Sequence, residues 1–181
     1  LFFKPMSSIK RIGIVLKPHQ HDALKTICDL TLWLAEREIE VVGGPDIERE
    51  RVEHQTGCAV KEVPTENLAA AVDLILVLGG DGTMIATARM IEDLEVPVLG
   101  INYGGLGYLT EFRIEELYSA LGSILDGNYR LDKRVMLRTL HQRGDEVVDR
   151  NRVLNDVVIN KSALARIIEI EAHLNDQFVN S

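Results

Sequence analysis

The chain has 181 residues, of which 46% are hydrophobic and 27% are charged, an ordinary composition for a folded globular protein. Its formal net charge of −8 argues against a surface that binds nucleic acid or an anionic membrane, so a site for a phosphorylated ligand must be local. No apolar run approaches the ~20 residues that a membrane helix needs. The two cysteines, Cys28 and Cys58, have neither zinc-site nor disulfide spacing. We therefore expect a cytoplasmic protein with free thiols.

Strand-like and helix-like segments alternate over residues 1–127. The expected strands are Ile9–Leu16, Glu40–Val42, Leu74–Leu78 and Val96–Ile101. The expected helices are Ala23–Arg37, the segment after Thr83, and Glu115–Leu125, with a charged helix or loop at Asp46–Glu53. Alternation of this kind predicts an α/β fold with a doubly wound, Rossmann-like parallel sheet.

The pattern changes after Gly127, where alternating apolar and polar residues replace the helical segments. The alternating segments are 133–142 and 166–174, the turns are Arg143–Asp145 and Asn175–Asp176, and a last short strand is Gln177–Val179. These features predict a second, antiparallel β-rich domain over residues 128–181, with a domain boundary near Gly127. About 50 residues is close to the lower limit for an independent core, so we expect this domain to be incomplete.

The apolar run Leu74–Leu78 ends in three glycines around one carboxylate, Gly79, Gly80, Asp81 and Gly82. Such a run is typical of a strand covered on both faces, and open α/β sheets bind ligands where these strands end. Because glycine has no Cβ, the backbone can adopt dihedrals closed to other residues, and its amides can approach a phosphate. The first amides of the next helix would point at the same place. Asp81 would repel a phosphate, so the combination indicates phosphoryl transfer to a hydroxyl.

A simpler alternative is a strand-ending turn in which Asp81 caps the next helix. On that alternative asparagine would replace Asp81 with little effect, whereas a carboxylate that only faces a phosphate site should add little to stability. The dinucleotide pattern G-x-G-x-x-G does not fit Gly79, Gly80 and Gly82, and no Walker-type GK[ST] follows them.

Three segments together resemble the NAD kinases, which phosphorylate the adenosine 2′-hydroxyl of NAD. They are LGGDGT at Leu78–Thr83, VLGINYGGLGYLT at Val98–Thr110 and LNDVVI at Leu154–Ile159. LGGDGT alone is shared with diacylglycerol and sphingosine kinases and approximately with phosphofructokinases, whereas the three in this order are highly specific. The resemblance implies an α/β domain followed by a β-rich domain that continues beyond the region matching Asn180, with the active site between them.

The resemblance implies that Asp81 is the catalytic base and, with Gly82, a nucleotide contact. Gly79, Gly80 and Thr83 would belong to the same nucleotide site. The phosphoryl donor, ATP or polyphosphate, would be held by the glycine amides and a Mg²⁺ ion with few protein ligands. An ordinary carboxylate suffices as the base, because proton removal comes late in a loose phosphoryl-transfer transition state. The resemblance further implies a homodimer or homotetramer.

Four more residues acquire roles in NAD binding from the same resemblance. Asn155 and Asp156 would bind the nicotinamide side of NAD, Arg166 its pyrophosphate or ribose, and Tyr108 would stack near the adenine. Each has a simpler alternative. Asn155 and Asp156 can form a cap or turn before a strand at Val157–Ile159, Arg166 can be a solvent-facing strand residue, and Tyr108 can belong to a glycine-rich crossover.

Two other functional classes remain open from the sequence. One is a lipid kinase of the diacylglycerol type, which shares GGDGT but lacks the other two segments. The other is a nucleotide-binding module without turnover. The five histidines show no metal-binding spacing, so we expect no metal site built from them.

Overall fold

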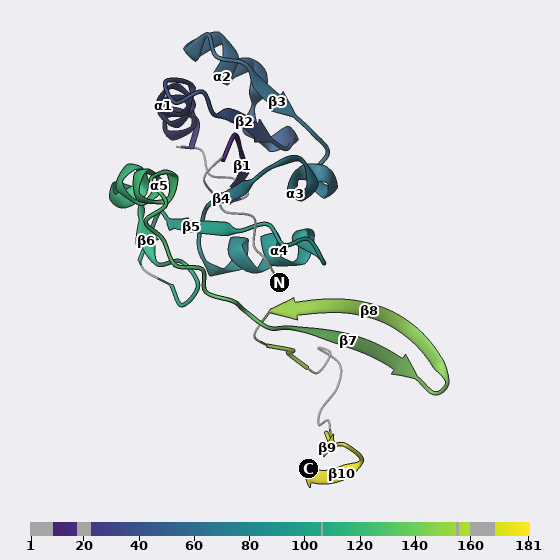
Figure 1. Ribbon diagram of the computed structural model, residues 1–181. Helices are drawn as coiled ribbons and strands as arrows, with labels where there is room; N and C mark the ends of the chain where they lie inside the picture. The colour runs from purple at the N-terminus through teal and green to yellow at the C-terminus, as the bar shows by residue number, and fades with distance from the viewer. Residues whose placement is uncertain (1–8, 18–22, 106, 155, 160–168) are drawn as a thin grey trace.

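The computed structural model describes residues 9–17, 23–105, 107–154, 156–159 and 169–181. Its main unit is a six-stranded sheet whose paired strands are all parallel (Figure 1). Its strands are β1 Arg11–Leu16, β2 Glu40–Gly43, β3 Val60–Glu62, β4 Leu74–Leu78, β5 Val98–Asn102 and β6 Phe112–Arg113. The α-helices are α1 Ala23–Ala35, α2 Arg49–Thr56, α3 Leu68–Ala71, α4 Asp81–Ile91 and α5 Leu117–Leu125. Short 3₁₀ turns lie at Pro45–Ile47, Thr65–Asn67 and Ile114–Glu116.

The strand order β3-β2-β1-β4-β5-β6 is that of a Rossmann-like, doubly wound sheet. From β1 the chain moves outward to β2 and β3, then returns to place β4 on the other side of β1. The order therefore reverses between β1 and β4, and ligands bind in open α/β sheets at such a reversal, beyond the carboxyl ends of the strands. The predicted fold class is confirmed.

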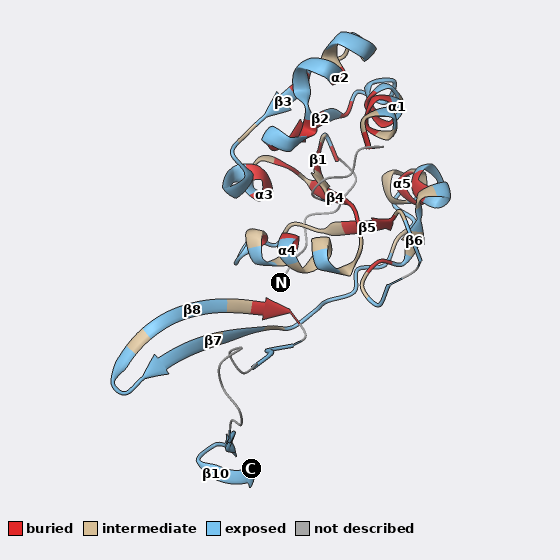
Figure 2. Ribbon diagram, turned by 180° about the vertical axis from the view of Figure 1, so that it is seen from behind, coloured by how far each residue is buried: buried red, intermediate tan, exposed pale blue. Residues whose placement is uncertain are grey.

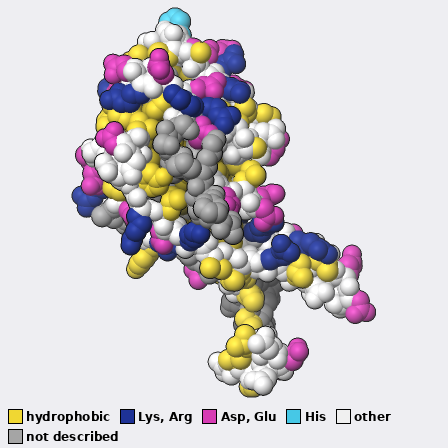
Figure 3. All heavy atoms as spheres, viewed as in Figure 1, with side chains coloured by type: hydrophobic (Ala, Val, Ile, Leu, Met, Phe, Trp, Pro, Cys, Tyr) yellow, Lys and Arg dark blue, Asp and Glu magenta, His cyan; other side chains and the backbone are white. Residues whose placement is uncertain are grey.

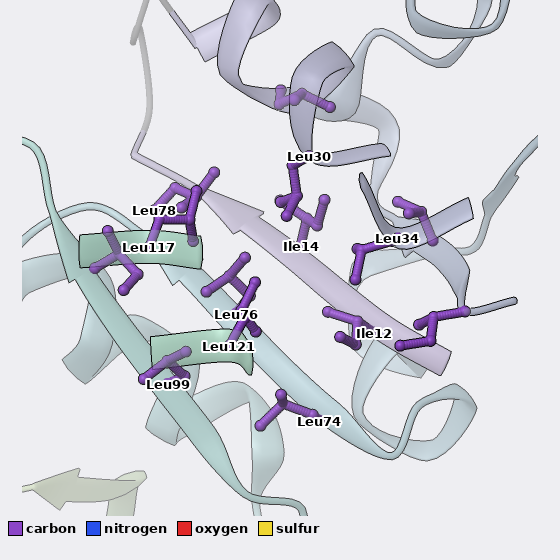
Figure 4. Packing of buried hydrophobic residues seen from close by; sticks show 14 of the residues in the cluster. Ile12, Ile14, Leu30, Leu34, Leu74, Leu76, Leu78, Leu99, Leu117 and Leu121 are labelled. Atoms are coloured by element: carbon purple, nitrogen blue, oxygen red, sulfur yellow. The ribbon is translucent and has the colours of Figure 1, made fainter. Parts of the chain in front are cut away.

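The central strand β4 explains why the sheet holds together. All five of its residues are buried, and alternate side chains enter two separate hydrophobic clusters. Leu74, Leu76 and Leu78 join the cluster that includes residues of α1 and α5 (Figure 4), whereas Ile75 and Val77 join residues of α3 and α4. The unbroken apolar sequence of β4 is thus required by helices on both faces of the sheet.

Several element boundaries differ from those predicted. Leu74–Leu78 is confirmed, and the charged stretch at 46–53 contains most of α2. Helix α4 begins at Asp81 rather than after Thr83. Strands β3 and β6, helix α3 and the strand at 146–154 were not predicted. Strand β3 has only three residues with a single buried position and β6 has two residues, too few to show a pattern.

Two antiparallel hairpins follow the parallel sheet. Strand β7 Met136–Arg143 pairs with β8 Glu146–Leu154, and β9 Ala172–Leu174 pairs with β10 Gln177–Asn180. The predicted antiparallel character is confirmed, as is the Asn175–Asp176 turn, whose residues have positive φ. The predicted strand at Val157–Ile159 is wrong, since these exposed residues form no strand in the structure. The domain boundary near Gly127 stays a prediction.

Strand β8 is attached to the parallel unit through α4. Val153 and Leu154, at its end, are buried, while most of the hairpin is exposed (Figure 2). Arginine side chains gather on this hairpin (Figure 3). One of them, Arg152, donates two hydrogen bonds of 2.5 and 2.6 Å to the carboxylate of Asp93, just beyond α4. This bidentate ion pair links β8 to the end of the helix that begins at Asp81.

The packing of β4 predicts a large loss of stability when one of its buried side chains is shortened. We expect Leu76→Ala to lower the free energy of unfolding by about 2–5 kcal/mol, because Leu76 is fully buried and its removal leaves a cavity. The matched control Leu94→Ala, at a side chain 47% exposed, should change it by less than about 0.5 kcal/mol. Urea unfolding of both variants measures the difference, and equal effects would contradict this account of the core.

Candidate active site

The glycine turn lies at the carboxyl edge of the sheet, where the strand order reverses. Backbone hydrogen bonds join the central strands up to this point: Lys17 N–H donates to Leu78 O at 3.0 Å, and Gly79 N–H donates to Ile101 O at 2.9 Å. The turn that follows β4 is therefore hydrogen-bonded into the sheet between the ends of β1 and β5. This is the position at which a doubly wound sheet offers a ligand site.

Of the three glycines only Gly79 is needed for space, and none is needed for an unusual dihedral. None of Gly79, Gly80 and Gly82 has a positive φ, so that part of the sequence interpretation is wrong. A Cβ on Gly79 would overlap the side chain of Thr83, whereas a Cβ on Gly82 would meet nothing within 4 Å. Gly79 thus lets the helix turn back closely on the strand, and Gly82 leaves the surface beside Asp81 open.

Helix α4 starts with Gly80 as its N-cap residue. Thr83 and Met84 N–H groups donate to Gly80 O at 3.0 and 3.1 Å. The N–H groups of Asp81 and Gly82 precede the first of these helical bonds, so they remain directed out of the helix end. A negatively charged group is favoured there both by these donors and by the helix dipole.

The Asp81 side chain does not cap its own helix. Instead its carboxylate accepts hydrogen bonds from the backbone of a distant loop: Tyr108 N–H donates to Oδ2 at 2.8 Å and Leu109 N–H to Oδ1 at 3.0 Å. Thr110 donates twice to Oδ1, from its N–H at 3.3 Å and from its hydroxyl at 3.4 Å. The helix-cap alternative is therefore wrong, and Asp81 joins the start of α4 to the 108–110 segment.

These donors keep Asp81 ionised. Partial removal from water acts to raise the pKa of the Asp81 carboxyl, but the donors of the 108–110 segment outweigh it and hold the pKa below its ordinary value. A lowered pKa in the folded state means that the charged contact stabilises the protein at neutral pH. That stabilisation is lost as the pH falls through the lowered pKa.

The buried side chains of Asn102 and Thr110 form hydrogen bonds that hold the loop after β5. Asn102, at the end of β5, donates from Nδ2 to Gly105 O at 2.7 Å and to Thr110 Oγ1 at 3.0 Å, and its Oδ1 accepts from Gly104 N–H at 2.8 Å. Both side chains are buried, and Thr110 is fully so. Gly107 lies against Asp81 so closely that a Cβ there would overlap the carboxylate. The loop conformation and the position of Asp81 therefore depend on one another.

Comparison with known proteins identifies the family. A family model described as the ATP-NAD kinase N-terminal domain matches residues 12–129. The NAD kinase of Geobacter metallireducens is 41% identical over 175 residues, which cover 96% of this chain and 59% of that protein. The NAD kinase of Citrifermentans bemidjiense is 41% identical over 173 residues, with the same coverage. The chain belongs to the NAD kinase family.

A solved structure supports the fold independently. Yeast NADH kinase, in a crystal structure with NADH, superposes with a TM-score of 0.67 at 20% sequence identity, covering 80% of this chain and 46% of that one. At this identity the likeness concerns the fold alone. Because the chain spans 59% of the length of the bacterial NAD kinases, it corresponds to somewhat over half of such a protein.

The structure brings together some of the residues that the NAD kinase resemblance singled out. Gly79, Gly80, Asp81, Gly82 and Thr83 form one turn. Tyr108 lies beside it through its hydrogen bond to Asp81, and its side chain is 95% exposed, free to meet a ligand.

The other predicted contacts, Asn155, Asp156 and Arg166, follow the β7–β8 hairpin in the sequence. Asp156 is exposed and donates its N–H to Leu154 O at 3.0 Å, directly after the buried end of β8. Asn155 and Arg166 lie outside the described residues. Their assigned roles in a NAD kinase remain predictions.

Sequence reasoning missed Asn102 and Thr110. The available signal was a polar residue ending the apolar strand β5, directly before a glycine-rich loop. The role of Asn102 depends on its hydrogen bonds to Gly104, Gly105 and Thr110. The loop brings these residues together only when it folds, so their spacing in the sequence does not reveal the contacts.

Among the described residues, no three His, Cys, Asp or Glu side chains gather closely enough to hold a metal ion. Within the same part of the chain, no helix has the length and apolar character needed to cross a bilayer.

The contact between Gly107 and Asp81 predicts a sensitive position. We expect Gly107→Ala to displace the loop and to speed amide hydrogen exchange at residues 108–110 by about one to two decades, the effect of an overpacking penalty of about 1–3 kcal/mol. Gly105→Ala is the matched control, because a Cβ there would meet nothing within 4 Å. Exchange measured by NMR should be unchanged in the control. Equal exchange in both variants would contradict the close contact.

Proposed function

We propose that the protein transfers the terminal phosphoryl group of ATP, or of polyphosphate, to the adenosine 2′-hydroxyl of NAD and so produces NADP. The observation that carries the proposal is the Asp81 carboxylate, ionised beside a glycine turn at the strand-order reversal, in a chain of the NAD kinase family.

The glycine turn is suited to the phosphates of the donor. The backbone N–H groups at the start of α4 are directed outward, and Gly82 leaves open space in front of them. In a protein of net charge −8, backbone donors supply positive potential that side chains do not. Thr83, on the first turn of α4, has its side chain against Gly79 and would contribute its hydroxyl to the same site.

Asp81 performs the proton transfer in this proposal. It orients the 2′-hydroxyl and accepts its proton as the new oxygen–phosphorus bond forms and the bond to the leaving oxygen of ADP breaks. A carboxylate with a lowered pKa is a weak base, but little basicity is needed because the hydroxyl becomes strongly acidic only late in a loose transition state. The protein's main contribution is then to hold the hydroxyl in line with the phosphorus.

A Mg²⁺ ion bound with the donor would neutralise charge on its phosphates. The described residues do not form a protein cage for such an ion. We therefore assign no residue as its ligand.

NAD binding would involve Asn155 and Asp156 at the nicotinamide side, Arg166 at the pyrophosphate or ribose, and the exposed ring of Tyr108 near the adenine. A carboxamide and a carboxylate can bond amide and ribose groups, while a guanidinium suits phosphate. In this proposal the enzyme acts in the cytoplasm as a homodimer or homotetramer.

An acceptor comparison tests the proposal directly. The protein is incubated with ATP and Mg²⁺ and with NAD, with diacylglycerol, or with no acceptor, and the products are identified by mass spectrometry. We expect phosphate on the adenosine ribose of NAD and no phosphorylated lipid. Phosphatidic acid would indicate the lipid kinase alternative, and nucleotide binding without any product would indicate a module without turnover.

The role of Asp81 predicts a large loss of turnover. We expect Asp81→Asn to lower kcat for NAD phosphorylation by about 10²–10⁴, or ~3–5 kcal/mol of barrier, because the amide cannot accept the proton. Asp29→Asn is a suitable control, since Asp29 is a half-exposed carboxylate paired with Lys25 on α1. Steady-state kinetics decide the matter, and undiminished turnover in Asp81→Asn would remove the proposed base.

The role of Asn155 predicts a selective change in substrate binding. Asn155→Ala should raise KM for NAD by roughly one to two decades, as expected when one or two hydrogen bonds to a polar ligand are lost. KM for ATP should change little. Equal increases in both KM values would point to a general disturbance of the fold.

A further inference from the structure

Asn102 has an orientation that its neighbours determine completely. Its Oδ1 accepts from the N–H of Gly104, a group that can only donate, and its Nδ2 donates to the carbonyl of Gly105, a group that can only accept. A flipped amide would lose both bonds. The remaining Nδ2 hydrogen must therefore point to its third partner, Thr110 Oγ1, at 3.0 Å.

The hydrogen bond from Asn102 determines how the hydroxyl of Thr110 is oriented. Its hydroxyl accepts from Asn102 Nδ2, so its own hydrogen is available for the carboxylate oxygen of Asp81, at 3.4 Å. The residue is fully buried, and water does not compete for this hydroxyl. A directed chain thus runs from Asn102 through Thr110 to Asp81 Oδ1.

The two carboxylate oxygens of Asp81 accept different numbers of hydrogen bonds from the described residues. Oδ1 receives three donors, from Leu109 N–H and from both donors of Thr110. Among the described residues, Oδ2 receives one, from Tyr108 N–H at 2.8 Å. Each carboxylate oxygen has about two acceptor directions, so Oδ1 is saturated while Oδ2 keeps one open.

We propose, on the basis of the proposed function, that Asn102 and Thr110 are positioning residues which engage Asp81 Oδ1 and so reserve Oδ2 for the acceptor hydroxyl. The hydroxyl donates to the open direction of Oδ2, and its proton moves to that oxygen as the oxygen–phosphorus bond forms and the bond from phosphorus to the leaving oxygen of ADP breaks. Without the chain, the carboxylate can rotate and present either oxygen, and the hydroxyl loses its fixed alignment.

Substitutions at Thr110 separate positioning from packing. Thr110→Val keeps the volume and the backbone donor but removes the hydroxyl, whereas Thr110→Ser keeps the hydroxyl. We expect Thr110→Val to lower kcat for NAD phosphorylation about three- to thirtyfold, the loss typical of one orienting hydrogen bond, with KM for ATP and NAD nearly unchanged. Thr110→Ser should retain most of the wild-type kcat.

The control is another buried threonine. Thr31, on α1, is equally buried, and its hydroxyl has no hydrogen-bond partner among the described residues. Thr31→Val should leave kcat and both KM values at their wild-type levels. A fall in kcat of equal size in Thr31→Val and Thr110→Val, or an unchanged kcat in Thr110→Val, would overturn the proposal.

A second measurement does not depend on turnover. The Asp81 carboxyl carbon, followed by NMR in ¹³C-labelled protein, should titrate at higher pH in Thr110→Val than in wild type, because a donor to the charged form is lost. Thr110→Ser should titrate like wild type. If the wild-type protein phosphorylates no NAD, the proposed function fails, and this titration alone decides the positioning claim. Identical titration in all three proteins would refute it.

Discussion

The convergence of backbone N–H groups on one carboxylate organises the carboxyl edge of this sheet. Asp81 accepts from three successive residues, 108–110, and thereby joins the start of α4 to the loop that follows β5. Most charged side chains near a sheet edge would be satisfied by water. Here donors fixed by the backbone replace the water, so the charge itself determines where the loop lies. The loop conformation in turn requires glycine at Gly107, where no Cβ would fit.

Helix α4 carries this arrangement toward the C-terminal hairpins. Asp81 is its first residue, and Asp93 follows its last turn and binds Arg152 of β8 through two hydrogen bonds. Strand β8 ends at Leu154, just before Asp156. A single helix therefore connects the carboxylate assigned to chemistry with the strand that leads to the residues assigned to NAD. The exposed Asp93 gives the ion pair little weight in stability, but its bidentate geometry restricts direction.

The sequence predicts the parts of this fold that repeat a simple pattern. An apolar run predicts β4, the alternation of strands and helices predicts the doubly wound sheet, and apolar–polar alternation predicts the antiparallel character of the C-terminal part, although not strand β8. It does not predict β3, which has one buried residue, nor the lack of a strand at Val157–Ile159, whose strand-forming residues lack a pairing partner in the described structure. Asp81 stands out through its charge among glycines. Asn102 and Thr110 do not, because their role exists only once the loop has folded back on β5.

The contacts of Asp81 also change how the stability of an Asp81 variant must be interpreted. A carboxylate that faced only a phosphate site would strain the folded protein, and replacing it would preserve or improve stability. Asp81 instead accepts the loop's donors, so it contributes to folding and is available for chemistry at the same time. Loss of stability on its replacement is then no evidence against catalysis. The decisive distinction lies between its two oxygens, since Oδ1 carries the structural contacts and Oδ2 has the remaining acceptor capacity.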